Sequence, residues 1–154
     1  MQWQCLRFDQ LTTDQLYDIM KLRVDVFVVE QNCPYPELDG HDKAQDVHHL
    51  IAYDKGTLMA YLRLLPAGTT YDCVSIGRVI TAEAARGKGM GNNLLTQGLA
   101  YAEQLWPGQD IEIGAQSHLQ SYYGRFGFEP SSDEYLEDGI PHIDMRLTKN
   151  PAAA

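Results

Sequence analysis

Cysteine is scarce in this sequence of 154 residues, and its placement excludes two structural roles. The three cysteines, Cys5, Cys33 and Cys73, are odd in number, widely spaced and never arranged as a CxxC pair. They therefore predict neither a zinc site nor a disulfide framework. We expect no bound metal.

Long apolar runs and a basic N-terminal segment are also lacking. No run approaches the roughly 20 apolar residues of a membrane-spanning helix, so no membrane partner is expected. The opening residues MQWQCLRFDQ lack the basic and then apolar pattern of a secretory signal peptide. A cytoplasmic location, in a reducing compartment, is the simplest expectation that fits both observations.

Basic residues are outnumbered, with 12 Lys and Arg against 21 Asp and Glu and a net charge of −9. Nucleic acids and anionic membranes bind basic surfaces, so neither is expected as a partner. The acidic balance is compatible with a cationic substrate. Hydrophobic residues make up 44% of the chain, enough for a packed core. With no internal repeat, we predict one domain over residues 1–150 and a tail at 151–154.

The spacing of apolar and turn-forming residues predicts the order of helices and strands. Thr12 and Gln15 form a capping-box pattern at the start of an amphipathic helix that runs to about Val28. A polar loop follows over residues 30–46, long enough to be a binding loop or lid. Strands are predicted at residues 2–8, 48–54, 58–65, 73–81, 111–115 and 143–147, and further helices at about 89–105 and 119–126.

The glycine-rich stretch ARGKGMGNNLL at residues 85–95 predicts a phosphate-binding loop. A Walker loop is excluded, because Gly89 follows the Gly-Lys pair where a hydroxyl residue should bind magnesium. A dinucleotide fingerprint is disfavoured, because Asn92 stands where its third glycine belongs. The remaining pattern, R-x-x-G-x-G from Arg86, runs from a strand into a helix N-terminus. Backbone N–H groups there can bind a pyrophosphate, and glycine lets the backbone approach the phosphate oxygens.

Two motifs together resemble a known family. RVITAEAARGKGMGNNLL, residues 78–95, is similar to the acetyl-CoA-binding motif of the GNAT superfamily of N-acetyltransferases. AQSHLQSYYGRFGF, residues 115–128, is similar to its second motif, in which Tyr123, Gly127 and Phe128 fill the characteristic places. The segments LRVDVFVVEQNCPYPELD and EDGIPHIDM resemble the ElaA subgroup of that family. The resemblance spans most of the chain.

The resemblance implies an α/β domain with a mixed, mostly antiparallel sheet flanked by helices. The sheet is expected to splay apart between the strand ending near Thr81 and the strand at 111–115. Acetyl-CoA would lie in that cleft as co-substrate. The binding residues it implies, with Gln116 standing where many members carry asparagine, are Val79, Ile80, Thr81, Arg86, Gly87, Lys88, Gly89, Met90, Gly91, Asn92 and Gln116.

The same resemblance implies direct transfer of the acetyl group to a primary amine, with no covalent enzyme intermediate. Tyr123 is the expected proton donor to the departing thiolate, although its periodicity alone would place it in the core. Tyr122, its neighbour, is expected to pack. For Arg86, pairing with phosphate and exposure to solvent are both open.

The attacking amine must be neutral, so a general base is needed. His142, after the rigid turn Gly139-Ile140-Pro141, is our candidate because imidazole titrates near neutral pH. Glu112, Glu30 and the pair His48 and His49 are the other candidates. The two adjacent histidines should face opposite sides of their strand, with one of them exposed.

The acceptor is expected to be a small-molecule or peptide amine. Two acidic segments, one with Glu37, Asp39, Asp42 and Asp46 and one over residues 129–145, are expected to line its entrance. A homodimer is a possible assembly. Two other functions stay open: an enzyme resembling acyl-homoserine-lactone synthases, and a non-catalytic sensor that binds acetyl-CoA.

Overall fold

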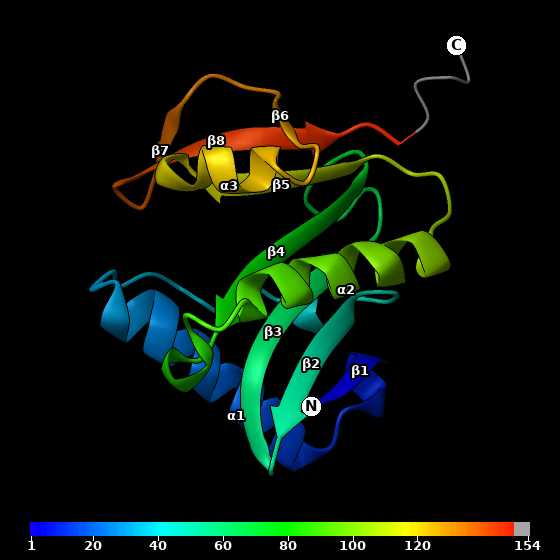
Figure 1. Ribbon diagram of the computed structural model, residues 1–154, viewed down its shortest axis with the longest axis vertical. Helices are drawn as coiled ribbons and strands as arrows, with labels where there is room; N and C mark the ends of the chain where they lie inside the picture. The colour runs from blue at the N-terminus through cyan, green and yellow to red at the C-terminus, as the bar shows by residue number, and fades with distance from the viewer. Residues whose placement is uncertain (150–154) are drawn as a thin grey trace.

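Eight strands form one mixed sheet in the order β1-β2-β3-β4-β5-β8-β6, with β7 pairing with β8 on the side (Figure 1). The computed structural model describes residues 1–149, so the tail predicted at 151–154 lies outside the described residues. All neighbouring strands are antiparallel except β4 and β5, which are parallel. The strands are β1 Gln2–Arg7, β2 His48–Asp54, β3 Thr57–Leu65, β4 Val74–Thr81, β5 Ile111–Gln116, β6 Glu129–Pro130, β7 Tyr135–Glu137 and β8 Ile140–Leu147.

The first helix begins where the sequence carries a cap. The Thr12 hydroxyl oxygen accepts a hydrogen bond from the Gln15 N–H, and the Thr12 N–H donates to the Gln15 side-chain oxygen, so the predicted capping box is confirmed. The expected helix to Val28 changes type at residue 24 and continues in π-helical geometry. The helices are α1 Thr13–Arg23, the π-helical segment Val24–Glu30, α2 Met90–Leu105 and α3 Gln120–Gly124, with 3-10 turns at Phe8–Gln10, His41–Lys43, Glu83–Ala85 and Ser117–Leu119.

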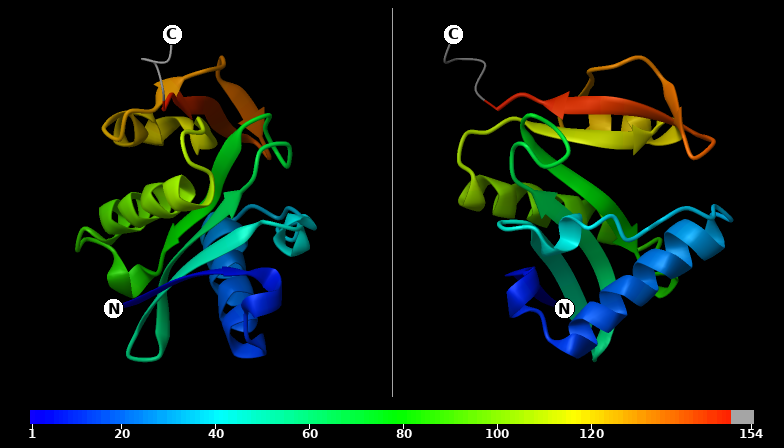
Figure 2. Two further views of the ribbon diagram at one scale, coloured as in Figure 1. Left: turned by 90° about the vertical axis from the view of Figure 1, so that its right-hand side faces the viewer. Right: turned by 180° about the vertical axis from the view of Figure 1, so that it is seen from behind.

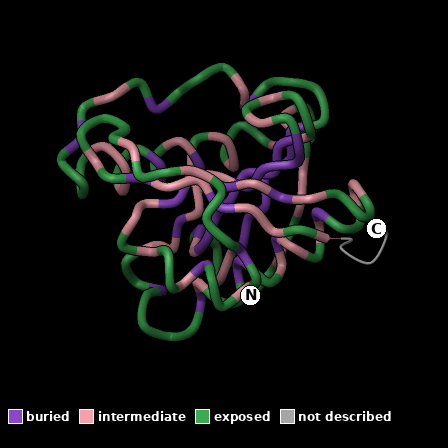
Figure 3. Tube along the Cα trace, turned by 90° about the horizontal axis from the view of Figure 1, so that it is seen from above, coloured by how far each residue is buried: buried purple, intermediate pink, exposed green. Residues whose placement is uncertain are grey.

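Helices cover both faces of the sheet. Figure 2 shows α2 and α3 on one face and α1 on the other. The larger apolar cluster joins Leu94 and Leu95 of α2 and Phe128 to the first face, and a smaller one joins Ile19 of α1 to Tyr61 on the second. Buried backbone accordingly runs through the middle of the molecule in Figure 3. We call the face that α2 and α3 cover the front face, and the face that α1 covers the rear face.

The sheet splits in its middle. β4 and β5 pair only at Val74 with Ile111 and at Ser75 with Glu112, and they diverge beyond these residues. Figure 1 shows β5, β8 and α3 leaning away from β4 and α2. The predicted fold class, a mixed and mostly antiparallel splayed sheet flanked by helices, is confirmed.

A buried guanidinium group anchors the long loop that follows Glu30. Arg23 of α1 has no exposed surface, and its Nε donates to Glu37 at 2.6 Å while its Nη1 donates to Asp42 at 2.6 Å. Burial lowers the pKa of Arg23, but Tyr61 and the two carboxylates outweigh it and raise the pKa above its usual value. One side chain therefore fixes two points of the loop to α1.

Two further arginines complete this buried network. Arg63 of β3 donates to Asp39 at 2.8 Å and to Asp42 at 3.0 Å, and Arg78 of β4 donates to Glu37 at 2.7 Å. Three guanidinium groups thus balance three carboxylates. The expectation that Glu37 and Asp42 line a substrate entrance is wrong, because both are buried in these ion pairs.

His49 lies beside this network. Its Nε2 donates to the Asp42 carbonyl at 3.1 Å, which leaves Nδ1 to accept from the Tyr61 hydroxyl at 2.6 Å. His48 faces the other side of the strand and meets the edge of Trp106. The expected opposite orientation is therefore confirmed, but the expected exposure of one ring is wrong. Both residues are buried, because helices or loops cover both faces of β2.

The buried His49 predicts a loss of stability in mild acid. Burial lowers the pKa of His49 from its ordinary value of about 6.5, so the unfolded chain binds more protons below that pH. We expect the free energy of unfolding in urea to fall from pH 7.5 to pH 5.0, by up to about 2 kcal/mol. His49→Gln should reduce this pH dependence, whatever its effect on absolute stability. An unchanged slope in that variant would contradict the assignment.

Candidate active site

The divergence of β4 and β5 opens a cleft of about 910 Å³ through the sheet. Its lining comes from β4, the start of α3, the long loop and the β7–β8 hairpin, and it reaches Arg86 at the beginning of the glycine loop. The other predicted residues of that loop, Gly87 to Asn92, do not line it. Seven of the predicted site residues line this cleft: Val79, Ile80, Thr81, Arg86, Gln116, Tyr123 and His142. The structure therefore brings the two sequence motifs and His142 to one place.

A bulge in β4 shapes one wall. Arg63 pairs with Gly77 and Tyr61 pairs with Ile80, so β4 carries one more residue than β3 between these two pairs. Arg78 adopts a φ of 52° at this point, a conformation that is uncommon for a residue with a side chain. Bulges leave a residue outside the ladder of hydrogen bonds. Together with the missing β5 partner beyond Ser75, this exposes β4 backbone to the cleft.

The glycine loop turns directly into α2. Gly87 and Gly89 have φ values of 81° and 73°, which only glycine adopts readily. Gly89 is the N-cap of α2, and it has no side chain to cap the first turn. The N–H groups of that turn are thus free of side-chain caps, and the positive end of the helix dipole lies with them. This local geometry is that of an anion-binding helix N-terminus.

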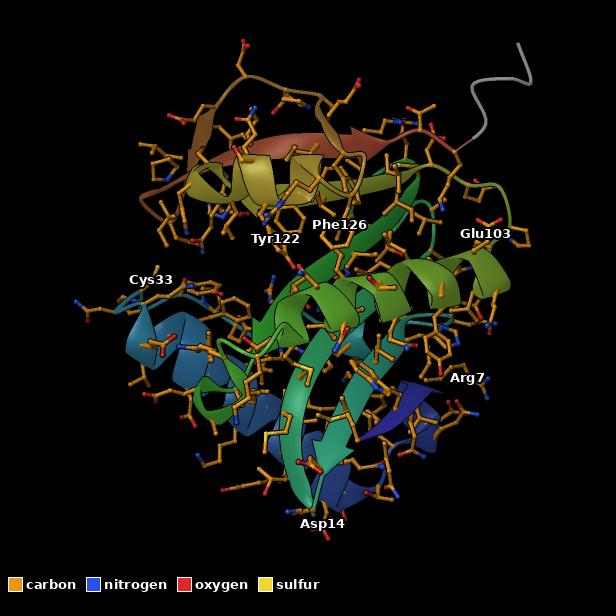
Figure 4. All side chains as sticks on the ribbon, in the orientation of Figure 1. Arg7, Asp14, Cys33, Glu103, Tyr122 and Phe126 are labelled. Carbon is orange, nitrogen blue, oxygen red and sulfur yellow. The ribbon has the colours of Figure 1, made fainter. Side chains whose placement is uncertain are left out.

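Tyr122 reaches from α3 to the same helix start. A methyl group on Gly91 would lie 3.3 Å from the Tyr122 hydroxyl oxygen. Figure 4 shows Tyr122 and Phe126 on the side of α3 that faces α2. The Tyr122 ring packs against the core as expected, while its hydroxyl lies beside the glycine loop. Tyr122 therefore belongs to the surroundings of the glycine loop, which its sequence position did not indicate.

The Arg86 guanidinium group forms an ion pair with the Glu30 carboxylate. Its Nη1 and Nη2 donate to the two Glu30 oxygens, each at 2.9 Å, and its Nε donates to the Thr81 carbonyl. Arg86 is thus not simply solvated, and contact with a phosphate would require it to exchange partners. The hydrogen bond from Arg86 lowers the pKa of Glu30, which weakens Glu30 as a candidate base.

Tyr123 presents its side chain to the cleft from α3. It is 7% exposed and packs edge-on against Tyr122 and Phe128. Burial, with a smaller effect of Tyr122, raises the pKa of Tyr123 to about 12. The phenol therefore keeps its proton at neutral pH and can donate it or a hydrogen bond.

His142 has a defined proton arrangement. Its Nδ1 lies 2.7 Å from the Ile140 carbonyl oxygen, so Nδ1 carries a proton and Nε2 of the neutral ring has a free lone pair. Nε2 faces a Glu137 carboxylate oxygen at 3.5 Å, and Tyr135 stacks on the ring. A proton taken up at Nε2 would be paired with Glu137. This geometry suits a general base.

The other base candidates lie outside the cleft, except for Glu30. Glu112 is directed at Arg146, at 3.4 Å, and does not line the cavity. His48 and His49 are held in β2, away from the lining. Of the predicted base candidates, His142 and Glu30 therefore line the cleft, and His41 and His118 also border it.

Two contacts bridge the rims of the cleft. The Gln116 amide donates to the Gln31 side-chain oxygen at 3.3 Å, and the Cys33 thiol lies 3.6 Å from the Asp138 carbonyl oxygen. Both contacts join the segment after the π-helical turn to the second half of the chain. Sequence patterns do not indicate them, because their partners are 85 and 105 residues apart.

Two structural features bear on other functions. Within residues 1–149, no group of three or more His, Cys, Asp or Glu side chains is placed to hold a metal ion. In the same part of the chain, no helix has the length and apolar character needed to cross a membrane.

Known proteins are similar to this chain both in sequence and in fold. The family model described as "Acetyltransferase (GNAT) domain" matches residues 16–149. Protein ElaA of Escherichia coli K12 is 44% identical over 145 residues, which cover 94% of this chain and 95% of ElaA. The crystal structure of E. coli ElaA matches with a TM-score of 0.89 and 43% identity, and it covers 95% of this chain and 98% of that one.

Two further solved structures are informative. An acyl-CoA N-acyltransferase from Pseudomonas aeruginosa has a TM-score of 0.92 at 49% identity, covering 96% of this chain and 99% of that one. BjaI, described as a CoA-dependent acyl-homoserine lactone synthase, has a TM-score of 0.79 at 15% identity over 96% of this chain and 83% of its own, and it shares the fold alone. The chain therefore belongs to the GNAT acetyltransferase family and, within it, resembles ElaA.

Proposed function

We propose that the protein transfers the acetyl group of acetyl-CoA to the nitrogen of a primary amine, by direct attack within a ternary complex. The observation that carries the proposal is the cleft itself. It joins a strand with free backbone groups, a buried phenol and an imidazole, and the glycine loop that leads from Arg86 on its rim ends at the uncapped N-terminus of α2. These are the groups needed to bind a pyrophosphate and to move one proton off nitrogen and one onto sulfur.

The residues around the cleft fit the co-substrate in a defined order. The first turn of α2 and its glycine loop would bind the pyrophosphate through backbone N–H groups. The free backbone of β4 at Val79 and Ile80 would pair with the amide-containing arm as an added strand does. A backbone N–H there would donate to the thioester oxygen, which stabilises negative charge as it develops. Gln116 lies on the opposite rim and can contact the same arm.

In the reaction, the amine lone pair forms a C–N bond to the acetyl carbon, and the C–S bond breaks with its electron pair on sulfur. His142 takes the proton that nitrogen loses. Tyr123 faces the departing sulfur and donates to it. A free thiol has a pKa near ~8.5, below that of Tyr123, so complete proton transfer from the phenol is uphill. The hydrogen bond formed while charge grows on sulfur is thus the main contribution of Tyr123, and solvent restores the remaining protons.

The proposed binding of the pyrophosphate by the glycine loop can be tested by placing one negative charge in the loop. Gly91→Glu adds a carboxylate beside the expected pyrophosphate and crowds the Tyr122 hydroxyl. We expect the dissociation constant of acetyl-CoA, measured by calorimetry, to rise at least about tenfold, or about 1.4 kcal/mol. Gln104→Glu adds the same charge in the last turns of α2, on an exposed position, and should leave binding unchanged. Equal affinity in both variants would remove the loop from the binding site.

The role of Tyr123 can be tested by removing only its hydroxyl. Tyr123→Phe keeps the ring in its packing, so acetyl-CoA binding should change little. Turnover should fall by about 10²- to 10³-fold, the usual loss when one hydrogen-bond donor to a developing negative charge is removed. The measurement is kcat at saturating amine, with a single-turnover trace to separate chemistry from product release.

Tyr101→Phe is the matched control, since Tyr101 packs against the same core from α2 and does not line the cleft. It should leave kcat unchanged. An unaltered rate in Tyr123→Phe, or a loss explained by unfolding alone, would refute the donor role. A panel of acyl-CoA chain lengths in the same assay addresses the synthase-like alternative, which requires preference for a longer chain.

A further inference from the structure

Two tyrosine hydroxyls converge on one carboxylate at the rear face of β8. Asp144 accepts a hydrogen bond from the Tyr71 hydroxyl at 2.8 Å and one from the Tyr135 hydroxyl at 2.6 Å, both at Oδ1. Its backbone N–H donates to the Ser132 hydroxyl at 3.0 Å. We call Tyr71, Tyr135 and Asp144 the Asp144 cluster. These contacts fix the position of the carboxylate.

The cluster depends on the glycine that lies opposite Asp144 in β5. Ile113 and Ala115 pack in the front apolar cluster, so Gly114 between them faces the rear. A methyl group on Gly114 would lie 3.0 Å from the Tyr71 hydroxyl oxygen and 3.3 Å from the Tyr135 hydroxyl oxygen. The missing side chain at Gly114 therefore leaves the room in which both hydroxyls reach Asp144.

Tyr135 connects the cluster to His142. The two residues are paired across β7 and β8, and their rings stack with centroids 6.0 Å apart at an interplanar angle of 24°. Asp144 lies two residues further along β8 on the same face, and such diagonal neighbours are within reach of an aromatic side chain. The hydroxyl bound to Asp144 therefore holds the phenol ring alongside the imidazole. Since Nδ1 is bound by the Ile140 carbonyl, both the ring plane and the direction of Nε2 are restrained.

Tyr71 connects the cluster to the opposite wall of the cleft. It belongs to the loop between β3 and β4, which Figure 2 shows reaching toward β5 and β8. Its neighbour Thr70 lines the cleft. β4 is the wall expected to hold the thioester, and its pairing with β5 ends at Ser75. The hydrogen bond from Tyr71 to Asp144 thus restrains the spacing between the β4 wall and the β8 wall.

We propose that the Asp144 cluster positions His142, setting the direction of Nε2 and its distance from the acetyl group on β4. This inference rests on the proposed function, because it concerns the base of that reaction. The three residues act through the imidazole and are positioning residues. A base must lie within about 2.6–3.2 Å of the nitrogen that loses its proton, and a misplacement of about 1 Å can reduce a rate about 100-fold.

Removing single hydroxyls tests the proposal. Tyr135→Phe and Tyr71→Phe keep both rings but release them from Asp144. We expect kcat for acetylation of n-propylamine to fall about tenfold in each variant, with an unchanged KM for acetyl-CoA. Tyr53→Phe is the matched control, because the Tyr53 hydroxyl donates to Asp18 at 2.7 Å outside the cleft. It should leave kcat unchanged.

The carboxylate itself allows a test by conservative replacement. Asp144→Asn keeps an acceptor oxygen for both tyrosine hydroxyls, so kcat should stay within about threefold of the wild type. Asp144→Ala removes the acceptor, and kcat should fall about tenfold or more. Equal rates in the two variants would contradict the role of Asp144 as the shared acceptor.

A double-mutant cycle separates positioning from a general structural effect. If Tyr135 acts through the imidazole, Tyr135→Phe should have no further effect on kcat in a His142→Gln background. The same tenfold loss in both backgrounds would show a structural role alone. No loss in the wild-type background would show no role. Either result overturns the proposal.

The ring N–H signal of His142 gives a readout that needs no turnover. In protein labelled with ¹⁵N-histidine, the Nδ1–H bound to the Ile140 carbonyl should give a nuclear magnetic resonance signal that His142→Gln removes. Tyr135→Phe should broaden this signal through faster exchange with water, and Tyr53→Phe should not.

This signal also separates the inference from the proposed function. If n-propylamine is not acetylated, or if His142→Gln leaves kcat unchanged, the proposed reaction or its base fails. The signal alone then decides whether the cluster positions the ring, and an equally sharp signal in Tyr135→Phe would overturn the inference. If acetylation depends on His142 but not on the hydroxyls of the cluster, the proposed function stands and this inference fails.

Discussion

The buried guanidinium group of Arg23 is the contact on which the rear of the molecule depends. The loop between Glu30 and β2 has little regular structure of its own, and it lies where one wall of the cleft must be. Arg23 ties it to α1 at Glu37 and Asp42, and these carboxylates in turn hold Arg78 and Arg63 of the sheet. Removing one member would leave buried charges unpaired, which is far more costly than never having buried them. An irregular segment thereby becomes a rigid wall.

The second constraint is the early separation of β4 and β5. A sheet can open in its middle only if other packing replaces the missing ladder, and here α2 and α3 provide it through the front apolar cluster. The separation makes backbone groups of β4 available that a complete sheet would consume. The bulge at Arg78 extends this effect, and the same residue uses its side chain to hold the loop. The bulge that exposes β4 backbone and the anchor of the loop thus meet in one residue.

Much of the fold follows from local patterns in the sequence. The strands from β1 to β5 and helix α2 were predictable because periodicity, caps and turns agree over their whole length. β6 and β7 were not, since two or three residues carry no period and pair only because β8 lies beside them. β8 itself begins at Ile140 rather than at 143, because β7 pairs with its first residues.

The candidate site likewise has a part that could be predicted from the sequence and a part that could not. Tyr123 and His142 were proposed from motif and chemistry, and both line one cleft, whereas Gly87 to Asn92 of the glycine loop lie outside its lining. The partners of the acidic loop were not predictable, because Arg23, Arg63 and Arg78 lie 14 to 41 residues from the carboxylates they bind. Charge composition suggested an acidic entrance, whereas pairing makes that wall neutral. The prediction that His48 or His49 is exposed was wrong for a related reason. The segments that cover the two faces of β2 are distant in sequence, and both residues are buried.

One side of the cleft offers main-chain groups of β4, with the glycine loop beyond Arg86, whereas the rear is built from side chains such as Arg63, Glu137 and His142. Exchanging a side chain alters its own surroundings but leaves the course of the main chain nearly intact. The two ends of the cleft can therefore change at different rates. Under the proposed function, substitutions at the rear would redirect the protein to another acceptor while the opposite side keeps the same donor, which makes the rear wall the natural place to redesign specificity.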